Sequence, residues 1–119
     1  MEIIVRPHRY GKTTELIKRA SQVKYGLIVC SSKNESFRIW DMISEMMKSG
    51  EITQAPPMPI TYREFLDREY AGKNITEFFI DNADNLLQSI TPVKIGAITL
   101  TDDYKIHNVD KYYDEVEPI

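Results

Sequence analysis

The chain has 119 residues, of which 42% are hydrophobic and 28% charged, and this ordinary composition at this length predicts one soluble globular domain. Its net charge of −3 excludes a strongly basic nucleic-acid-binding surface over the whole molecule, although not a local one. The single cysteine, Cys30, excludes an internal disulfide, and together with two histidines it supplies too few ligands for a structural zinc site.

The chain begins with the pattern of a phosphate-binding loop. Residues 2–6 centre on an apolar run and predict a buried parallel strand. Gly11-Lys12-Thr13-Thr14 follows and opens an amphipathic helix that we expect to end near residue 24. The match covers three of the four fixed positions of the pattern Gly-x-x-x-x-Gly-Lys-[Ser/Thr], because Arg6 stands at the first glycine.

Each residue type in this loop suits polyphosphate chemistry. The backbone N–H groups of such a loop and the positive end of the helix dipole bind phosphate oxygens, and Gly11 keeps that backbone free of a Cβ. Lys12 would reach the β- and γ-phosphates, and the Thr13 hydroxyl would occupy one corner of a Mg²⁺ octahedron. Thr14 would contact the α-phosphate or cap the helix. The alternative is that these residues only end a turn and cap a surface helix.

A second strand and a long helix are expected next. The strand covers residues 26–30, and the capping-box pattern Ser32-x-x-Glu35 predicts a helix from about residue 33 to Gly50. Apolar residues at helical spacing predict its core face, with a cofactor or partner surface as the alternative for Trp40 and the methionines. These residues are Phe37, Ile39, Trp40, Met42, Ile43, Met46 and Met47.

The middle of the chain is expected to hold a loop, a short strand and a short helix. Residues 51–59 contain three prolines and predict the loop. A strand at 58–61 leads into a second capping box, Thr61-x-x-Glu64, and the helix that follows is expected to end before Gly72. This arrangement has a purely architectural explanation.

The second informative stretch is 76–84. A strand at 78–80 delivers Asp81 at its carboxyl end, where ligands bind in open α/β sheets. There Asp81 can accept a hydrogen bond from a Mg²⁺-bound water or from Thr13, and so complete a metal site made of Thr13 and Asp81. The alternative is that Asp81 only caps the next helix.

Arg6, Arg9 and Tyr10 belong to the same expected site. Arg6 could pair with a phosphate, or with Asp81 when the site is empty. Arg9 and Tyr10 adjoin the loop in the sequence, so we count them among the nucleotide-binding residues, with Tyr10 as a candidate for stacking on a base. For Arg9 the alternative is a plain loop residue.

The end of the chain predicts one more helix and one more strand. The helix covers about 86–90 and is broken by Pro92, and a buried strand at 95–100 ends at Thr101. Thr101 could sense the γ-phosphate or the attacking water, unless it only begins a turn. Residues from 104 onward are expected to form an edge strand or docked arm followed by a frayed terminus.

Strands that alternate with helices imply a three-layer α/β/α fold with a mainly parallel five-stranded sheet. Residues 1–103 are expected to form the nucleotide-binding domain, and residues 104–119 an arm or edge strand of the same domain. No apolar run is long enough to span a membrane, so we expect a cytoplasmic protein without a membrane partner.

Over residues 2–101 the chain resembles the additional-strand P-loop NTPases, the class that includes RecA-like recombinases and the first domain of helicases. Four segments follow the phosphate loop in the order of the helicase motifs: Cys30-Ser31-Ser32, Ile60-Thr61-Tyr62, Asp81-Asn82-Ala83-Asp84 and Leu100-Thr101. The resemblance implies a RecA-like core that binds Mg²⁺ and ATP. It also implies that the strand ending at Thr101 lies between the loop strand and the Asp81 strand.

The chain departs from this family at the residue that activates water. Helicase-like enzymes place a glutamate directly after the metal-binding aspartate, whereas this chain has Asn82, which can position a water but cannot take its proton. Asp84 is a candidate replacement that would act through a shifted water, and Glu35 and Asp102 are further candidates. An arginine finger would have to come in trans, from Arg63 or Arg68 of an assembled protein, for example.

Three functions compete on these observations. The first is a Mg²⁺–ATP-binding P-loop protein, a weak or partner-stimulated ATPase in DNA replication, recombination or packaging, of the kind that compact phage genomes encode. Its candidate catalytic residues are Lys12, Asp81 and Asp84. The second, which Asn82 favours, is a non-hydrolysing nucleotide-binding assembly module.

The third is a small nucleotide or nucleoside kinase, because residues 11–17 look like the phosphate loop of the thymidine kinases that carry a zinc-stapled lasso. The expected partners are a nucleoside triphosphate and either a protein partner or further copies of the chain. Nucleic acid is a further candidate because basic residues gather in the first half, although solvated helix faces are the favoured explanation for them. Those residues are Lys18, Arg19, Lys24, Lys33 and Arg38.

Overall fold

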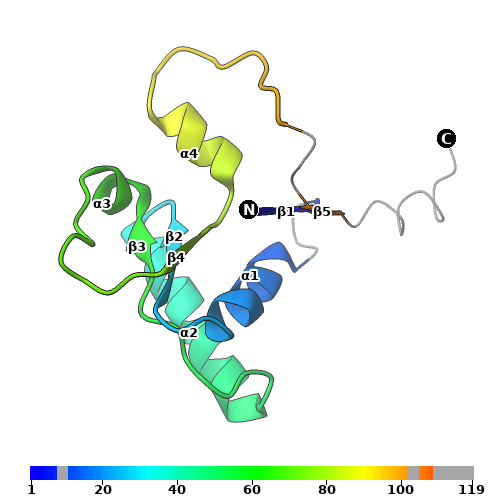
Figure 1. Ribbon diagram of the computed structural model, residues 1–119, viewed down its shortest axis with the longest axis vertical. Coiled ribbons are helices and arrows are strands. Elements are labelled where there is room, and N and C mark those ends of the chain that lie inside the picture. The colour runs from blue at the N-terminus through cyan, green and yellow to red at the C-terminus, as the bar shows by residue number, and fades with distance from the viewer. Residues whose placement is uncertain (8–10, 102–104, 109–119) are drawn as a thin grey trace, which may run out of the picture. The chain divides into compact units, whose positions relative to one another are not determined.

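The computed structural model describes residues 1–7, 11–101 and 105–108 (Figure 1). The chain divides into two compact units, one made of Met1–Lys12 with Ile95–Ile119 and the other of Thr13–Lys94. Both clusters of buried hydrophobic side chains found in the described part of the chain lie in the second unit. The second unit therefore has a hydrophobic core of its own.

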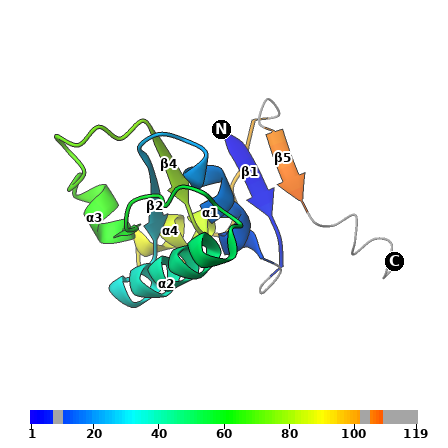
Figure 2. The same ribbon diagram turned by 90° about the horizontal axis from the view of Figure 1, so that it is seen from below.

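The second unit is an α/β fold built on a three-stranded parallel sheet in the order β3-β2-β4 (Figures 1 and 2). The central strand β2 (Gly26–Cys30) is buried along its whole length. On its two sides lie β3 (Ile60–Thr61) and β4 (Glu77–Ile80). The register places Val29 opposite both Ile60 and Ile80. An apolar run without alternation suits this central position, because helices cover both faces of the strand.

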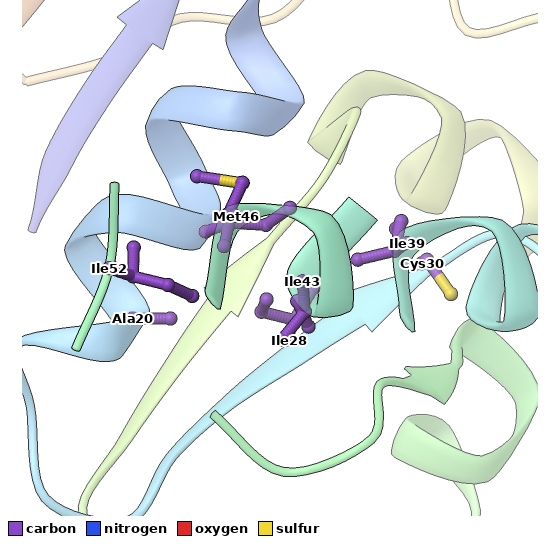
Figure 3. Close-up of a cluster of buried hydrophobic side chains, with 8 residues drawn as sticks. Ala20, Ile28, Cys30, Ile39, Ile43, Met46 and Ile52 are labelled. Atoms are coloured by element: carbon purple, nitrogen blue, oxygen red, sulfur yellow. The ribbon is translucent and has the colours of Figure 1, made fainter. Parts of the chain in front are cut away.

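Helices α1 (Lys12–Ser21) and α2 (Lys33–Ser49) pack on one face of the sheet, and α3 (Tyr62–Leu66) and α4 (Ala83–Ser89) pack on the other. Alternate side chains of a strand point to opposite faces, which is why Ile28 and Cys30 join one cluster while Val29 joins the other. The first cluster, shown in Figure 3, consists of Ile17, Ala20, Ile28, Cys30, Ile39, Ile43, Met46 and Ile52.

The predicted helix caps are confirmed. The Ser32 side chain accepts a hydrogen bond from the backbone N–H of Glu35 over 3.2 Å, and α2 ends at Gly50, whose φ of 82° is left-handed. In α3 the Thr61 side chain accepts from the N–H of Glu64, and the Glu64 carboxylate accepts from the N–H of Thr61. These bonds satisfy backbone donors that have no partner within the helix.

Gly26 allows the end of α1 to approach the sheet closely. A Cβ at this position would lie 2.9 Å from Cε2 of Phe79 and 3.2 Å from the backbone oxygen of Ala20. The first of these distances is shorter than real carbon contacts allow, so a side chain here would force the ring or the helix to move.

The core face predicted for α2 is partly wrong. Ser36, Ile39, Ile43 and Met46 form the buried face, whereas Phe37, Trp40 and Met47 are exposed. The apolar residues of α2 cover more than one helix face, and spacing alone cannot decide which face packs against the sheet. Phe37, Trp40 and Met47 thus form a second apolar stripe.

The first unit contains a parallel pair of strands. β1 (Glu2–Val5) pairs with β5 (Lys105–Asn108), with Glu2 opposite Lys105 and Val5 opposite Asn108. The predicted β1 strand is confirmed, but it is not fully buried, since both of its ends are exposed. β5 agrees with one of the two alternatives expected for the residues from 104 onward, an edge strand rather than a docked arm.

The predicted five-stranded sheet is not observed in the described residues, which hold the three-stranded and the two-stranded sheet. The strand predicted at 95–100 is wrong, because this segment has no regular secondary structure and its Ile98 and Leu100 are exposed. An apolar run shows that a segment can be buried in a sheet, but it does not show which strand would pair with it. No helix in the described ranges is long and apolar enough to cross a membrane.

Candidate functional site

The structure brings Thr13 and Asp81 into direct contact, although 68 positions separate them in the sequence. The Thr13 hydroxyl, in the first turn of α1, donates a hydrogen bond of 3.1 Å to Oδ2 of Asp81. Asp81 follows β4 directly and is 5% exposed. Its backbone N–H donates to the oxygen of Val29 over 2.9 Å, so the β2–β4 hydrogen-bond ladder also fixes its position. The predicted contact at the carboxyl end of the sheet is present.

The Thr13–Asp81 pair offers the oxygen ligands that Mg²⁺ prefers. Burying a carboxylate is costly unless it is hydrogen-bonded or bound to a metal, and the Thr13 hydroxyl supplies one such bond. The described residues contain no group of three or more His, Cys, Asp or Glu side chains that could hold a metal by themselves. A metal here would need waters and phosphate oxygens as its other ligands, which is the usual situation for Mg²⁺ at a nucleotide.

The turn after Asp81 is held by Tyr62, a residue to which the sequence assigned no role. Its buried hydroxyl lies 2.7 Å from the backbone oxygen of Asp81 and 3.0 Å from that of Asn82, and donates to both. Burial, followed by the charge of Asp81, raises the pKa of the Tyr62 phenol, so the group stays a donor at neutral pH. The sequence does offer one signal for this role: Tyr62 directly follows the helix-cap residue Thr61, and a tyrosine that is buried there needs a hydrogen-bond partner for its hydroxyl.

Asn82 has a left-handed backbone, with φ 53° and ψ 59°. Asparagine adopts this conformation more readily than most residues that have a Cβ. Asp84, the predicted replacement for the missing glutamate, lies in the first turn of α4 and is exposed. Its charge contributes to the raised pKa of Tyr62, behind burial and Asp81.

The loop residues of the predicted site fall partly within the described residues. Gly11 has a φ of 78°, a conformation that favours glycine, and Nη1 of Arg6 lies 3.4 Å from its backbone oxygen as a hydrogen-bond donor. Lys12 is the first residue of α1, and Thr14 lies in the first turn of that helix and is half-buried.

Four further predicted residues are not tested at the Thr13–Asp81 pair. Arg9, Tyr10 and Asp102 lie outside the described residues. Thr101 is exposed and belongs to the first unit, so its sensor role stays a prediction.

Two charged pairs lie on α2 and α3, the helices that follow the neighbouring strands β2 and β3. Arg38 donates to both carboxylate oxygens of Glu35, each over 2.9 Å, and Lys33 lies 3.2 Å from the carboxylate of Glu64. The bonds from Arg38 hold the pKa of Glu35 below its ordinary value. The charge of Asp81 contributes to the raised pKa of Arg38, behind the bond with Glu35. Glu35 is therefore engaged by an arginine, which weakens it as a candidate base.

No protein-family model, curated protein or solved structure matches this chain. The fold and the site together define a small α/β domain with a three-stranded parallel sheet. At the carboxyl edge of that sheet a helix-borne threonine meets a buried aspartate.

Proposed function

We propose that this protein binds a nucleoside triphosphate, with ATP as the first candidate, together with Mg²⁺. The observation that carries the proposal is the contact between Thr13 and Asp81. In the proposed site these two side chains hold the metal through oxygen, and Lys12 adds a cation to the backbone N–H groups at the start of α1. The order of Gly11, Lys12 and Thr13 at the start of the helix supports a polyphosphate as the ligand.

We infer that any hydrolysis is slow or depends on a partner. Asn82 cannot accept a proton from water, and Glu35 is paired with Arg38. Asp84 remains the candidate that could activate water, through a shifted position. If a partner supplies an arginine to the transition state, the gain in rate is about 10³ to 10⁵.

The second candidate is a nucleotide-binding module that does not hydrolyse its ligand. Asn82 favours it, because an amide side chain cannot take a proton from water. Its left-handed backbone is also one that a glutamate adopts less readily. Such a module would use nucleotide binding to control assembly with other proteins or with nucleic acid.

A thermal-shift titration with ATP, ADP and GTP, with and without Mg²⁺, tests the binding proposal. A ligand at 100 times its dissociation constant should add about 2.7 kcal/mol to the free energy of unfolding. Lys12→Ala should remove the shift, and Asp81→Asn should remove its dependence on Mg²⁺. Lys73→Ala, which changes an exposed lysine outside the site, is the control and should behave as the wild type. A wild-type shift that survives Lys12→Ala would overturn the proposal.

Phosphate release separates the two candidates. Sustained release of phosphate from ATP, with or without nucleic acid, that stops in Asp81→Asn identifies an ATPase. Mg²⁺-dependent binding without release above background identifies the non-hydrolysing module.

A further inference from the structure

The second apolar stripe of α2 lies on a flank of the helix, about 100° around the helix axis from the buried face that packs on the sheet. Phe37, Trp40 and Met47 are 54%, 37% and 40% exposed, and Ser44 occupies the fourth position of the same face. Spacings of three, four and three residues place these four side chains in one line along the helix. α2 forms one side of the second unit, as Figure 2 shows. Large apolar side chains that gather on an exposed face mark an interaction surface.

The spacing of the stripe is that of a helix–helix seam. Alternating steps of three and four residues average 3.5, the repeat with which two helices pack side by side. The stripe extends over eleven residues, and its first and last positions are about 15 Å apart along the helix, so the partner needs only a short helix. Ser44 does not oppose burial, because its hydroxyl already donates to the backbone oxygen of Trp40 over 3.1 Å.

Two opposite charges line the solvent side of the stripe. Asp41 and Lys48 are both exposed, and since they lie seven residues apart they project from the same side of the helix. Lys48 also lies 3.6 Å from Glu45 of its own helix, but both side chains of this pair are 75% exposed. Such an exposed pair is weak and leaves the ammonium group able to turn toward another carboxylate.

An antiparallel second copy of α2 complements this surface. Phe37 of one helix would then meet Met47 of the other, and the large Trp40 would meet the small Ser44. Asp41 of each copy would face Lys48 of the other, so the charge match occurs twice. A parallel pair in register would bring each residue beside its own copy and offers no such match. Self-complementarity of this kind is what a closed two-fold interface requires.

We propose that this face of α2 binds a second copy of the chain as an antiparallel, two-fold helix pair, with Asp41 of each copy paired to Lys48 of the other. The proposal does not depend on nucleotide binding. The pair buries few side chains, so the dimer should be weak and should dissociate on dilution.

Sedimentation velocity from about 1 µM to about 1 mM tests this proposal, since a small interface gives affinities in that range. Either Asp41→Lys or Lys48→Asp alone gives residues 41 and 48 the same charge, so both interchain pairs become repulsive and association should weaken about tenfold or more. The double variant Asp41→Lys with Lys48→Asp reverses both charges and should restore association to the wild-type range. Glu69→Lys makes the same charge change at an exposed position outside α2 and should leave association unchanged.

Fluorescence of Trp40, the only tryptophan, supplies a second measurement. Its emission should shift to shorter wavelength as the concentration rises, and Met47→Ser should reduce both the shift and the association. Circular dichroism of each variant confirms that α2 remains folded. A wild-type protein that stays monomeric over the whole range would overturn the proposal. A dimer that the double charge reversal does not restore, or that Met47→Ser leaves unchanged, would do the same.

Discussion

The phenol of Tyr62 connects the hydrophobic core to the turn that holds Asp81. Its ring is buried against Val29 and Leu86, and its hydroxyl binds the backbone oxygens of Asp81 and Asn82. The aspartate is thus held by the β2–β4 ladder on one side and by a side chain of α3 on the other. Its position therefore depends on an aromatic residue of the core that is not itself a candidate catalytic residue.

Replacing Tyr62 by phenylalanine should lower the free energy of unfolding by about 1–3 kcal/mol, because a buried carbonyl then loses its hydrogen-bond donor. Urea unfolding measures the loss. Tyr70→Phe is the matched control, because the Tyr70 ring also packs on an aromatic side chain, that of Phe65, but the residue is only half-buried. The control should stay within about 0.5 kcal/mol of the wild type. Equal stability of the Tyr62 variant and the wild type would show that the hydroxyl does not hold the turn.

The sequence predicts one half of this site well. Asp81 can be placed at a strand end from the apolar run before it, and Thr13 at a helix start from the glycine and lysine before it. The contact between them then follows from the order of parallel strands in α/β folds. The bond from Tyr62 to the turn cannot be predicted in this way, because it depends on how α3 lies across the end of β4.

At the scale of elements, α3 shows how local bonds stabilise a short helix. It has five residues, too few to be stable alone in water. The reciprocal bonds between Thr61 and Glu64 close its first turn, and Tyr62 anchors it in the second cluster. Lys33, from the start of α2, adds a hydrogen bond to the Glu64 carboxylate.

This cap should make stability depend on acid pH. The backbone N–H of Thr61, followed by the bond from Lys33, lowers the pKa of Glu64 below its ordinary value of 4.5. A lowered pKa in the folded state means that the stabilisation is complete above pH 4.5 and is lost as the pH falls through the folded value. Glu64→Gln can keep the bond to Thr61 but cannot titrate.

Thermal unfolding of both proteins across this range measures the effect. The wild type should lose up to about 1 kcal/mol more than the glutamine variant on acidification, which is the usual contribution of a cap. Parallel pH profiles of the two proteins would contradict this assignment.

The caps and the central strand were predictable because their signals are local. Ser32 and Thr61 each have a glutamate three residues later, and β2 is a run of five residues buried on both faces. The buried face of α2 and the state of residues 95–100 were not predictable, since each depends on a packing or pairing partner from elsewhere in the chain. Trp40 shows the difference, because its position on a helix was correct and its predicted burial was wrong.

At the scale of the whole molecule, Cys30 reports on the stability of the second unit. It lies at the end of the central strand and is 1% exposed. Burial raises the pKa of its thiol from the ordinary value of 9.0 to about 11. The folded protein therefore holds this group as a protonated, inaccessible thiol at neutral pH.

Labelling with a thiol reagent at neutral pH should be at least about 100-fold slower in the folded protein than in urea, because reaction requires opening of the core. Cys30 is the only cysteine, so the whole signal comes from this position. The stabilisation from keeping this thiol protonated is complete below pH 9.0 and is lost as the pH rises toward about 11. Over that range the labelling rate of the folded protein should therefore increase by a larger factor than the labelling rate of the unfolded protein. Labelling of the native protein at the unfolded rate would contradict the buried position.

The left-handed backbone of Asn82 explains why a glutamate is unsuited to this position. A residue with a longer side chain would adopt that backbone at a cost of about 1–2 kcal/mol. The two carbonyl bonds from Tyr62 hold the turn in this shape, so the backbone cannot relax around a new side chain without losing them. A water-activating glutamate therefore cannot be introduced by a single substitution at residue 82. The backbone of the turn and its hydrogen bonds with Tyr62 would have to be redesigned first.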